Sequence, residues 1–393
     1  MREAVIVAGA RTPLGKGIKG TLRNTRPDEL AQRVISAAVS RTPGLKTYQI
    51  DDVIIGCAMP EGPQGMNVAR IASLRSGLPV TVPGLTINRF CASGLQSIAF
   101  AANQIRCGCA DVIIAGGTES MSLVPLGGET FSPNPYLVDS YPDVYLNMGL
   151  TAENLGRKYS ISRSDQDLFA YQSHQKSLHA IKTSRFKDEI IPLEIPVAGI
   201  RPNGDTYSLK SKFEIDECPR IDTNIDTLKK LLPVFDKKGT VTAGNAAQLS
   251  DGAAAVVVTS KEKAIEQEWK ILGRFVSFTT VGVKPEEMGI GPIMAIPKVL
   301  ANAGLDKSSI GLIELNEAFA VQALTVINKL SLDPNKINVN GGAIALGHPL
   351  GCTGTRLTIT LLHEMKKQNI QYGLVSMCVG GGMGVAAIFE QLS

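Results

Sequence analysis

The sequence predicts an α/β protein built from two duplicated halves, with a different segment inserted between them. Short β-branched runs alternate with longer amphipathic stretches, which is typical of a mostly parallel sheet covered by helices on both faces. The same order of elements recurs about 260 residues further along the chain with similar spacing, which indicates duplication. An irregular, proline-containing stretch separates the two repeats.

In the first half, β-branched runs predict strands, and apolar residues at helical spacing predict helices. The helix at 93–105 is a clear case, because Leu95, Ile98, Ala102 and Ile105 recur near the helical period. The predicted elements are, in order, a strand at 5–7, a helix at 30–39, strands at 53–55 and 85–88, a helix at 93–105 and a strand at 111–115.

The second half repeats these elements in the same order, so we expect the halves to pack as pseudo-symmetric partners. The extended segment at 337–340 leads into a glycine turn, as the strand at 85–88 does in the first half. The predicted elements are a helix at 295–303, a strand at 310–315, the extended segment at 337–340, a helix at 353–365 and a strand at 374–377.

The segment between the halves is irregular at first and then contains a predicted helix at 165–181. Ser162 and Asp165 have the spacing of a capping box at its start. Loops inserted over a rigid sheet commonly form ligand sites. The sheet is predicted to resume at 253–259. We therefore expect three units, namely a first half at 1–118 plus 249–270, a loop domain at 119–248 and a second half at 271–393.

The composition argues against several classes of protein. The 393 residues include 40 basic and 36 acidic ones, and a net charge of +4 does not suggest a nucleic-acid partner. The seven cysteines are irregularly spaced, with no C-x-x-C pair. We therefore expect reduced thiols, with no disulfide framework and no metal. The absence of a signal sequence or a long apolar run predicts a cytoplasmic protein without a membrane partner.

Cys91 follows a predicted strand and lies at the start of a predicted helix. The first N–H groups of a helix lack partners, and the helix dipole is positive there. Both effects favour a thiolate, so we expect a lowered pKa for Cys91 and a nucleophilic role. The small neighbours Ala92, Ser93 and Gly94 would let a substrate approach closely.

His348 lies between Gly347 and Pro349, at the place in the second half that matches Cys91 in the first. Matching strand ends of two pseudo-symmetric halves would meet near their axis and bring His348 close to Cys91. An imidazole within hydrogen-bonding reach could take the thiol proton. The other histidines lie on mixed-charge helical stretches and are predicted to be at the surface; they are His174, His179 and His363.

Cys378 precedes a run of glycines, and such a turn can present backbone N–H groups to an anion. The N–H of Gly380 is our candidate oxyanion donor. A second thiol could carry a proton to or from carbon while Cys91 holds an acyl group. Asn316 follows the strand at 310–315 and could bind a substrate carbonyl through a water. It could equally cap the next helix.

Together these motifs resemble the thiolase family over nearly the whole chain. Three stretches are most similar to the degradative 3-ketoacyl-CoA thiolases: NRFCASGLQ, VGVKPEEMGIGP and the GCTG after His348. The biosynthetic acetoacetyl-CoA thiolases are near relatives. The other resembling stretches are VIVAGARTPLGK, VTAGNAAQLSDGAAAV, NEAF, GGAIALGHPLGCTG and CVGGGMG.

The resemblance implies a five-layer α-β-α-β-α arrangement with a loop domain that covers coenzyme A. It implies that Cys91 is the nucleophile that carries the acyl group and that His348 activates Cys91. It also implies that Cys378 is the cysteine that acts as acid and base. Asn316, through a water, and His348 would form one oxyanion hole. The backbone of Cys91 and Gly380 would form the other.

The resemblance also implies residues that contact coenzyme A or the acyl chain. Coenzyme A would act as a co-substrate, and no tightly bound cofactor is implied. The family usually has a serine where this chain has Ala247, so the backbone would have to serve there. The partners implied are acyl-CoA substrates and further copies of the chain, as a homodimer or homotetramer. The contact residues implied are Met148, Arg220, Ala247, Ala318 and Phe319.

We therefore expect thiolytic cleavage of a 3-ketoacyl-CoA to acetyl-CoA and a shortened acyl-CoA, as in fatty-acid β-oxidation. The alternative within the family is an acetoacetyl-CoA thiolase that condenses two molecules of acetyl-CoA. Outside it, a Cys–His thioester hydrolase would share the nucleophile and base but would not need Cys378. A non-catalytic CoA-binding protein is disfavoured because the full set of reactive residues is present.

Overall fold

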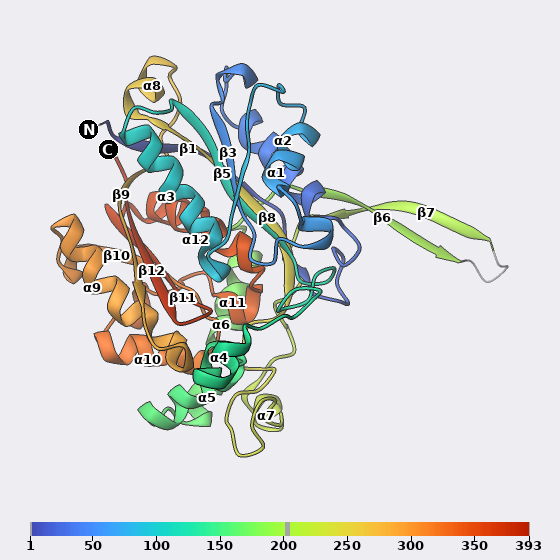
Figure 1. Cartoon of the computed structure of the whole chain (residues 1–393), viewed down its shortest axis with the longest axis vertical. Coiled ribbons are helices and arrows are strands. Elements are labelled where there is room, and N and C mark those ends of the chain that lie inside the picture. Colours follow the sequence, from blue (N-terminus) through green and yellow to red (C-terminus); the bar gives the residue numbers. More distant parts are fainter. Residues whose placement is uncertain (1, 201–204, 393) are drawn as a thin grey trace.

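The computed structural model describes residues 2–200 and 205–392, and its central feature is one large twisted sheet (Figure 1). The ten strands of this sheet are β1 (Ala4–Arg11), β2 (Gly15–Lys16), β3 (Asp52–Gly56), β4 (Leu85–Ile87), β5 (Val112–Ser120), β8 (Ser250–Ser260), β9 (Gly273–Gly282), β10 (Ile310–Leu315), β11 (Tyr372–Val379) and β12 (Met383–Glu390). They run in the order β10-β11-β12-β9-β1-β8-β5-β3-β4, with β2 paired to β8.

This order consists of two similar sets of strands joined edge to edge. In the first set β3 is parallel to β5, which is antiparallel to β8. In the second set β10 is parallel to β11, which is antiparallel to β12. The sets meet where β1 pairs with β9, through Val5 opposite Arg274 and Ile6 opposite Gly273. The matching directions support the predicted duplication.

Helices form three layers around the two sets of strands. The central layer consists of α3 (Ser93–Arg106) and α12 (Leu350–Gln368), whose apolar residues share one buried cluster with strands of both halves. The outer helices α1 (Pro27–Ser40) and α2 (Val68–Arg75) pack on the first half. On the second half lie α9 (Gly291–Ala303) and α10 (Ala320–Leu330). The predicted five-layer α-β-α-β-α arrangement is confirmed.

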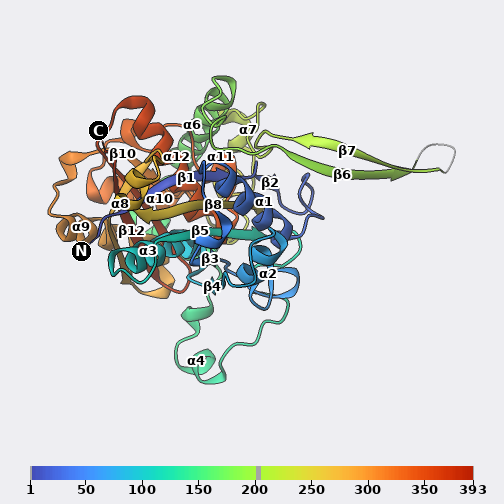
Figure 2. The ribbon, with the colours of Figure 1, turned by 90° about the horizontal axis from the view of Figure 1, so that it is seen from above.

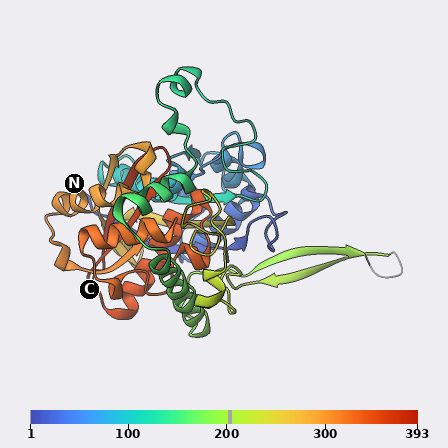
Figure 3. The ribbon, with the colours of Figure 1, turned by 90° about the horizontal axis from the view of Figure 1, so that it is seen from below.

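The segment between β5 and β8 adds elements outside these layers. The hairpin of β6 and β7 extends far from the body, and α4 projects in another direction (Figures 2 and 3). The elements of this segment are α4 (Pro135–Ser140), α5 (Met148–Tyr159), α6 (Arg163–Lys182), β6 (Leu193–Ile200), β7 (Thr206–Phe213) and α7 (Ile225–Lys229). The unit boundaries at 118, 248 and 270 stay predictions.

The cap of α6 follows the predicted pattern, since the Ser162 hydroxyl accepts the backbone N–H of Asp165 at 3.1 Å. None of the described helices is long and apolar enough to cross a membrane. Short helices complete the chain, namely α8 (Lys261–Glu266) and α11 (Ala343–Leu346).

The prediction of an extended segment at 337–340 is wrong beyond its first residue. Ile337 makes one isolated bridge to Ile313, and Asn338 then adopts a left-handed φ of 45°. Its side-chain amide bonds both the N–H and the C=O of Leu315, at 2.9 and 2.8 Å. Asparagine tolerates this conformation better than most residues. The chain therefore turns into α11 instead of adding a strand.

Glycines allow the two central helices to cross at very close range. A Cβ on Gly94 would lie 2.5 Å from the carbonyl oxygen of Gly351. A Cβ on Gly351 would lie 2.6 Å from the Thr118 oxygen and 2.7 Å from the Gly56 oxygen. The Thr355 hydroxyl donates to the Gly94 carbonyl at 2.9 Å across the crossing. These contacts hold the first turns of α3 and α12 together.

Because the helices cross so closely at Gly351, even a methyl side chain at this position should destabilise the fold. We expect Gly351→Ala to lower the free energy of unfolding by about 1–3 kcal/mol, the usual cost of overpacking, because backbone oxygens surround the added methyl. Gly282→Ala is the matched control, since a Cβ there meets no atom within 4 Å. It should change stability by less than about 0.5 kcal/mol in urea denaturation. Equal effects of the two substitutions would contradict this account of the crossing.

Candidate active site

Cys91 lies in a tight turn, Phe90–Ala92, between β4 and α3. Phe90 has a φ of 42°, which is uncommon for a bulky residue and marks a constrained turn. Its N–H donates to the Asn88 side chain at 2.7 Å, and the Asn88 amide donates to the Ala58 carbonyl at 2.9 Å. These bonds hold the turn that carries Cys91, whose side chain is buried.

The turn between β11 and β12 lies against Cys91. Gly381 and Gly382 have φ values of 77° and 81°, in the region that favours glycine. The backbone N–H groups of Gly380 and of Cys91 itself act to lower the pKa of the Cys91 thiol. Cys378 lies close enough that charge on Cys91 raises the pKa of the Cys378 thiol, after the larger effect of burial. The thiols of Cys91 and Cys378 and the N–H groups of Cys91 and Gly380 therefore lie in one small region.

His348 lies just before α12, and both of its ring nitrogens have partners. Nδ1 is 2.7 Å from the hydroxyl of Thr353, which donates its own hydrogen to the Pro349 carbonyl at 2.8 Å. The hydrogen-bond pattern thus assigns the ring proton to Nδ1 and the lone pair to Nε2. Nε2 lies 3.2 Å from the side-chain nitrogen of Asn316. Such an imidazole can accept a proton.

The crossing of the central helices brings these turns together. Since α12 contacts the turn Phe90–Ala92, and His348 directly precedes the N-cap of α12, His348 and Cys91 lie in neighbouring segments. The segments that hold these matching positions of the two halves therefore lie next to each other.

Asn316 is not the cap of the next helix, because α10 begins at Ala320 with Phe319 at its N-cap. The Asn316 N–H instead donates to the Ser376 carbonyl at 2.9 Å, beside β11. Its buried side-chain oxygen has no hydrogen-bond partner among the described residues. A buried acceptor normally finds a partner, so this oxygen is placed to bind a water or a polar substrate atom.

Burial controls the protonation of the site. The predicted lowering of the Cys91 pKa is wrong in its net direction: burial raises the pKa to about 11, although the N–H groups of Gly380 and Cys91 favour the thiolate. Burial, and then the charge of Arg356, lower the pKa of His348 to about 3. The resting site therefore holds neutral thiols and a neutral imidazole. A nearby base is needed to ionise Cys91.

Glu119 is an organising residue that the sequence analysis missed. This buried carboxylate accepts the N–H groups of Ala58 and Gly351, both at 2.8 Å, and that of Met59 at 3.2 Å. It also accepts the Gln64 amide at 2.6 Å. It thus links the end of β3 to the first turn of α12. The sequence signal that could have identified Glu119 is its place as an acidic residue at the end of a β-branched run.

Four of the five predicted coenzyme A contacts lie near one another. Ala247 donates its N–H to the Ala318 carbonyl at 2.9 Å. Phe319 packs edge-on against Phe235, with ring centroids 6.2 Å apart. Met148, Ala318 and Phe319 belong to the apolar cluster that contains Cys378. These residues therefore pack in one apolar cluster with Cys378.

Arg220, the fifth predicted contact, is exposed and lies beside α6. Its backbone N–H donates to Nδ1 of His174 at 3.1 Å. The surface position predicted for His174 is wrong, since its side chain is buried by this contact. Burial, followed by the Arg220 charge, lowers the pKa of His174 to about 4.

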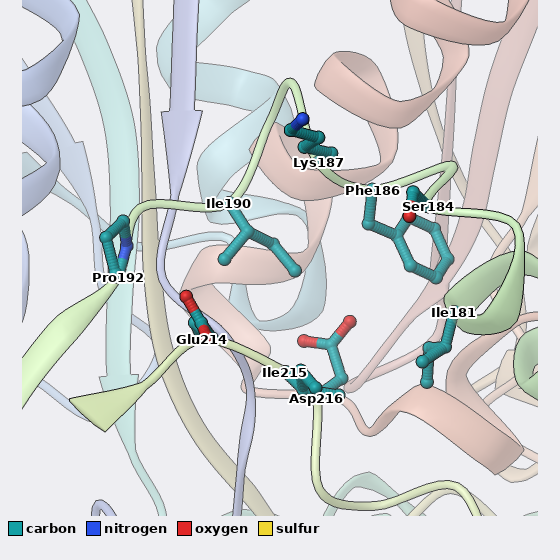
Figure 4. A pocket seen from close by; sticks show the side chains of 9 residues that line it. All are labelled: Ile181, Ser184, Phe186, Lys187, Ile190, Pro192, Glu214, Ile215 and Asp216. Atoms are coloured by element: carbon teal, nitrogen blue, oxygen red, sulfur yellow. The ribbon is translucent and has the colours of Figure 1, made fainter. Parts of the chain in front are cut away.

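A cavity of about 340 Å³ lies elsewhere, at the base of the β6–β7 hairpin (Figure 4). Its apolar wall includes Phe186, Ile190 and Ile215. It contains neither the cysteines nor the histidine described above. Among the described residues, no group of three or more His, Cys, Asp or Glu side chains is arranged to hold a metal ion.

Two family models cover almost the whole chain. "Thiolase, N-terminal domain" matches residues 4–262, and "Thiolase, C-terminal domain" matches residues 269–391. The chain belongs to the thiolase family. It is therefore an acyltransferase of the thiolase type.

Other thiolases resemble the chain over its full length. The 3-ketoacyl-CoA thiolase of Bacillus subtilis is 53% identical over 99% of this chain and 100% of its own. An acetyl-CoA acetyltransferase of Pseudomonas aeruginosa is 45% identical over 98% of each chain. The acetyl-CoA acetyltransferase structure from Bacillus anthracis has a TM-score of 0.90 at 41% identity, covering 100% of this chain and 99% of that one. Human mitochondrial 3-ketoacyl-CoA thiolase has a TM-score of 0.89 at 39% identity, with the same coverage.

The low pKa of His348 predicts a specific acid sensitivity. The unfolded chain binds a proton near pH 6.5, whereas the folded chain binds it only near pH 3. Stability is therefore lost as pH falls through this window, by about 1.4 kcal/mol per unit for one proton. We expect His348→Asn to reduce the slope of unfolding free energy against pH between 6 and 4.5. An unchanged slope would show that His348 is not held neutral by the fold.

Proposed function

We propose that this thiolase cleaves 3-ketoacyl-CoA with coenzyme A, giving acetyl-CoA and an acyl-CoA shortened by two carbons. The observation that carries the proposal is that buried Cys91 has a second thiol, Cys378, near it and backbone N–H groups, of Gly380 and Cys91, that favour its thiolate. The 53% identity to a protein named 3-ketoacyl-CoA thiolase supports it.

In the first half-reaction, His348 takes the thiol proton and the Cys91 sulfur attacks the 3-keto carbon. The N–H groups of Cys91 and Gly380 stabilise the oxyanion that forms. The C2–C3 bond then breaks, leaving the acyl group on Cys91 and an acetyl-CoA enolate. His348 and an Asn316-bound water stabilise the enolate, and Cys378 supplies the proton that its carbon takes up.

In the second half-reaction, the thiolate left on Cys378 removes the thiol proton of a new coenzyme A. The coenzyme A sulfur attacks the thioester, the bond to Cys91 breaks, the Cys91 sulfur takes back the proton held by His348, and the shortened acyl-CoA leaves. Coenzyme A is thus a co-substrate, and no tightly bound cofactor is required. Two thiols are needed because the group that handles the carbon-bound proton must differ from the group that is acylated.

The coenzyme A arm is proposed to lie along Ala247, Ala318, Phe319 and Met148, with Arg220 towards the solvent. Ala247 lacks a hydroxyl and its N–H is already bonded to the Ala318 carbonyl. Its carbonyl group is therefore the polar atom left for the pantetheine amide. We also propose that the enzyme works in the cytoplasm, as the sequence predicts.

A homodimer or homotetramer is proposed on the basis of an exposed apolar edge. β4 is the last strand of the sheet, and Leu85 on it is 41% exposed. Met66 and Val80 nearby in sequence are 92% and 77% exposed. Free strand edges with large apolar side chains favour pairing with another chain.

The alternative is an acetoacetyl-CoA thiolase that condenses two acetyl-CoA molecules. Several relatives named acetyl-CoA acetyltransferase, 43–45% identical to the chain, favour this second function. Both reactions use the same residues, so the depth of the acyl pocket separates them.

The role of Cys378 can be tested by replacing its sulfur with oxygen. Cys378→Ser should keep acylation of Cys91 but lower kcat at least about a hundredfold, the typical contribution of a general acid–base group. Mass spectrometry after incubation with substrate and no free coenzyme A should find the acyl mass on the Cys91 peptide. Cys352→Ser is the matched control, because it makes the same change in an equally buried thiol. Full turnover by Cys378→Ser would remove Cys378 as the proton carrier.

A chain-length series should decide between the two thiolase activities. For the proposed degradative enzyme, kcat/KM for thiolysis should rise from acetoacetyl-CoA to longer 3-ketoacyl-CoA substrates, because each buried methylene contributes about 0.8 kcal/mol. Activity confined to acetoacetyl-CoA would favour the alternative. Release of a free acid instead of acyl-CoA would identify a hydrolase.

A further inference from the structure

The ring of His348 is held by a small network of hydrogen bonds. Nδ1 lies 2.7 Å from the hydroxyl oxygen of Thr353, and Nε2 lies 3.2 Å from the side-chain nitrogen of Asn316. Thr353 lies in the first turn of α12. All three side chains are buried, so each polar atom depends on its protein neighbours for hydrogen bonds.

The backbone of His348 is fixed separately from its ring. Its N–H is shared between the Ser250 hydroxyl at 3.2 Å and the Gln248 carbonyl at 3.3 Å. The preceding residue, Gly347, has a φ of 99°, and a Cβ there would lie 2.2 Å from the Ser250 hydroxyl oxygen. These contacts set where the imidazole lies. The partners of its two nitrogens then set which nitrogen carries the proton.

The hydrogen bonds place the ring proton on Nδ1. Burial lowers the pKa of His348 to about 3, so near neutral pH the ring carries one proton. With this proton on Nδ1, three bonds form together. Nδ1–H donates to the Thr353 oxygen, the Thr353 hydroxyl donates to the Pro349 carbonyl at 2.8 Å, and the Asn316 amide donates to Nε2.

A proton on Nε2 would leave this network with fewer bonds. The Thr353 hydroxyl would have to turn away from the Pro349 carbonyl in order to donate to Nδ1. The Asn316 amide would have to rotate so that its oxygen, which has no partner among the described residues, accepts from Nε2. Two bonds would then replace three. The first arrangement is favoured because one hydroxyl can donate and accept at the same time.

Removal of the Thr353 hydroxyl would reverse this preference. A proton on Nδ1 would then be a buried donor that has lost its acceptor, which is costly. A proton on Nε2 could still be accepted by the oxygen of Asn316, which is otherwise unpartnered. The ring would therefore adopt the tautomer that has no lone pair on Nε2.

We propose that Thr353 is a positioning residue that fixes the tautomer of His348, so that the lone pair lies on Nε2, the nitrogen that takes the Cys91 proton. This inference rests on the proposed role of His348 as the base for Cys91. In that step the proton moves from sulfur to Nε2, the ring becomes positively charged, and Nδ1–H stays bonded to the Thr353 oxygen. The same bond is kept when Nε2 returns the proton to the Cys91 sulfur.

Thr358 offers a matched control on the same helix. It is as fully buried as Thr353, and its hydroxyl donates to the carbonyl of Gly354, four residues earlier, at 2.9 Å. Thr353 makes the same kind of bond to Pro349. Of these two described threonines, only Thr353 contacts a ring nitrogen of His348. Valine at either position removes the same helix bond, but only valine at 353 removes the contact with the histidine.

The test reads the tautomer directly by NMR. In protein labelled with ¹⁵N-histidine, the His348 signals are identified by their loss in His348→Asn, and the chain has only four histidines. The wild type should carry the ring proton on Nδ1, whereas Thr353→Val should carry it mainly on Nε2. Acylation of Cys91 by substrate should slow about ten- to a hundredfold in Thr353→Val, as expected for the loss of one buried hydrogen-bond acceptor. KM should change by less than about twofold, because the hydroxyl acts on the base and not on substrate binding.

Further variants separate the hydroxyl from the packing around it. Thr353→Ser keeps the hydroxyl and should keep the wild-type tautomer and most of the acylation rate. Thr358→Val should leave both unchanged. If Thr353→Val does not fold, Thr353→Ala removes the same acceptor with a smaller side chain and should show the same move of the proton to Nε2.

A wild-type ring proton on Nε2 would overturn the proposal, as would an unchanged tautomer in the variants that lack the hydroxyl. An equal loss of acylation rate in Thr353→Ser or in Thr358→Val would also overturn it, because the contact with His348 would then not be the cause. The NMR signals do not depend on turnover. A wild type with its proton on Nδ1 but without thiolysis would therefore count against the proposed function alone.

Discussion

The close crossing of α3 and α12 is the constraint on which the active site depends. Gly94 and Gly351 let the first turns of the two helices approach to backbone contact. Cys91 precedes one of these turns and His348 precedes the other. Glu119 fastens the same region by accepting N–H groups from the end of β3 and from Gly351. Larger side chains at the crossing would separate two turns that come from different halves of the chain.

Duplication explains why the reactive groups meet at that point. Each half places two parallel strands beside an antiparallel one, and each sends a helix into the shared central layer. Equivalent strand ends then lie on either side of one small region. The second half adds the glycine turn after Cys378, where the N–H of Gly380 favours the thiolate of Cys91.

Burial gives this region its chemical character. The interior disfavours charge, so it raises the pKa values of the thiols and lowers that of His348. Backbone N–H groups favour negative charge on Cys91 without carrying a net charge themselves. The site is therefore neutral at rest, and in the proposed reaction these N–H groups would stabilise the oxyanion.

The sequence by itself determined the alternation of strands and helices, the duplication, and the residues Cys91, His348, Cys378 and Gly380 as candidates, because these follow from local periodicity and motif chemistry. Only the tertiary structure decided that residues 337–340 form a turn, because a side chain bonds a distant strand there. It likewise decided that His174 is buried and that the Cys91 pKa is raised. These properties depend on desolvation and contacts summed over segments far apart in sequence, which no local pattern contains.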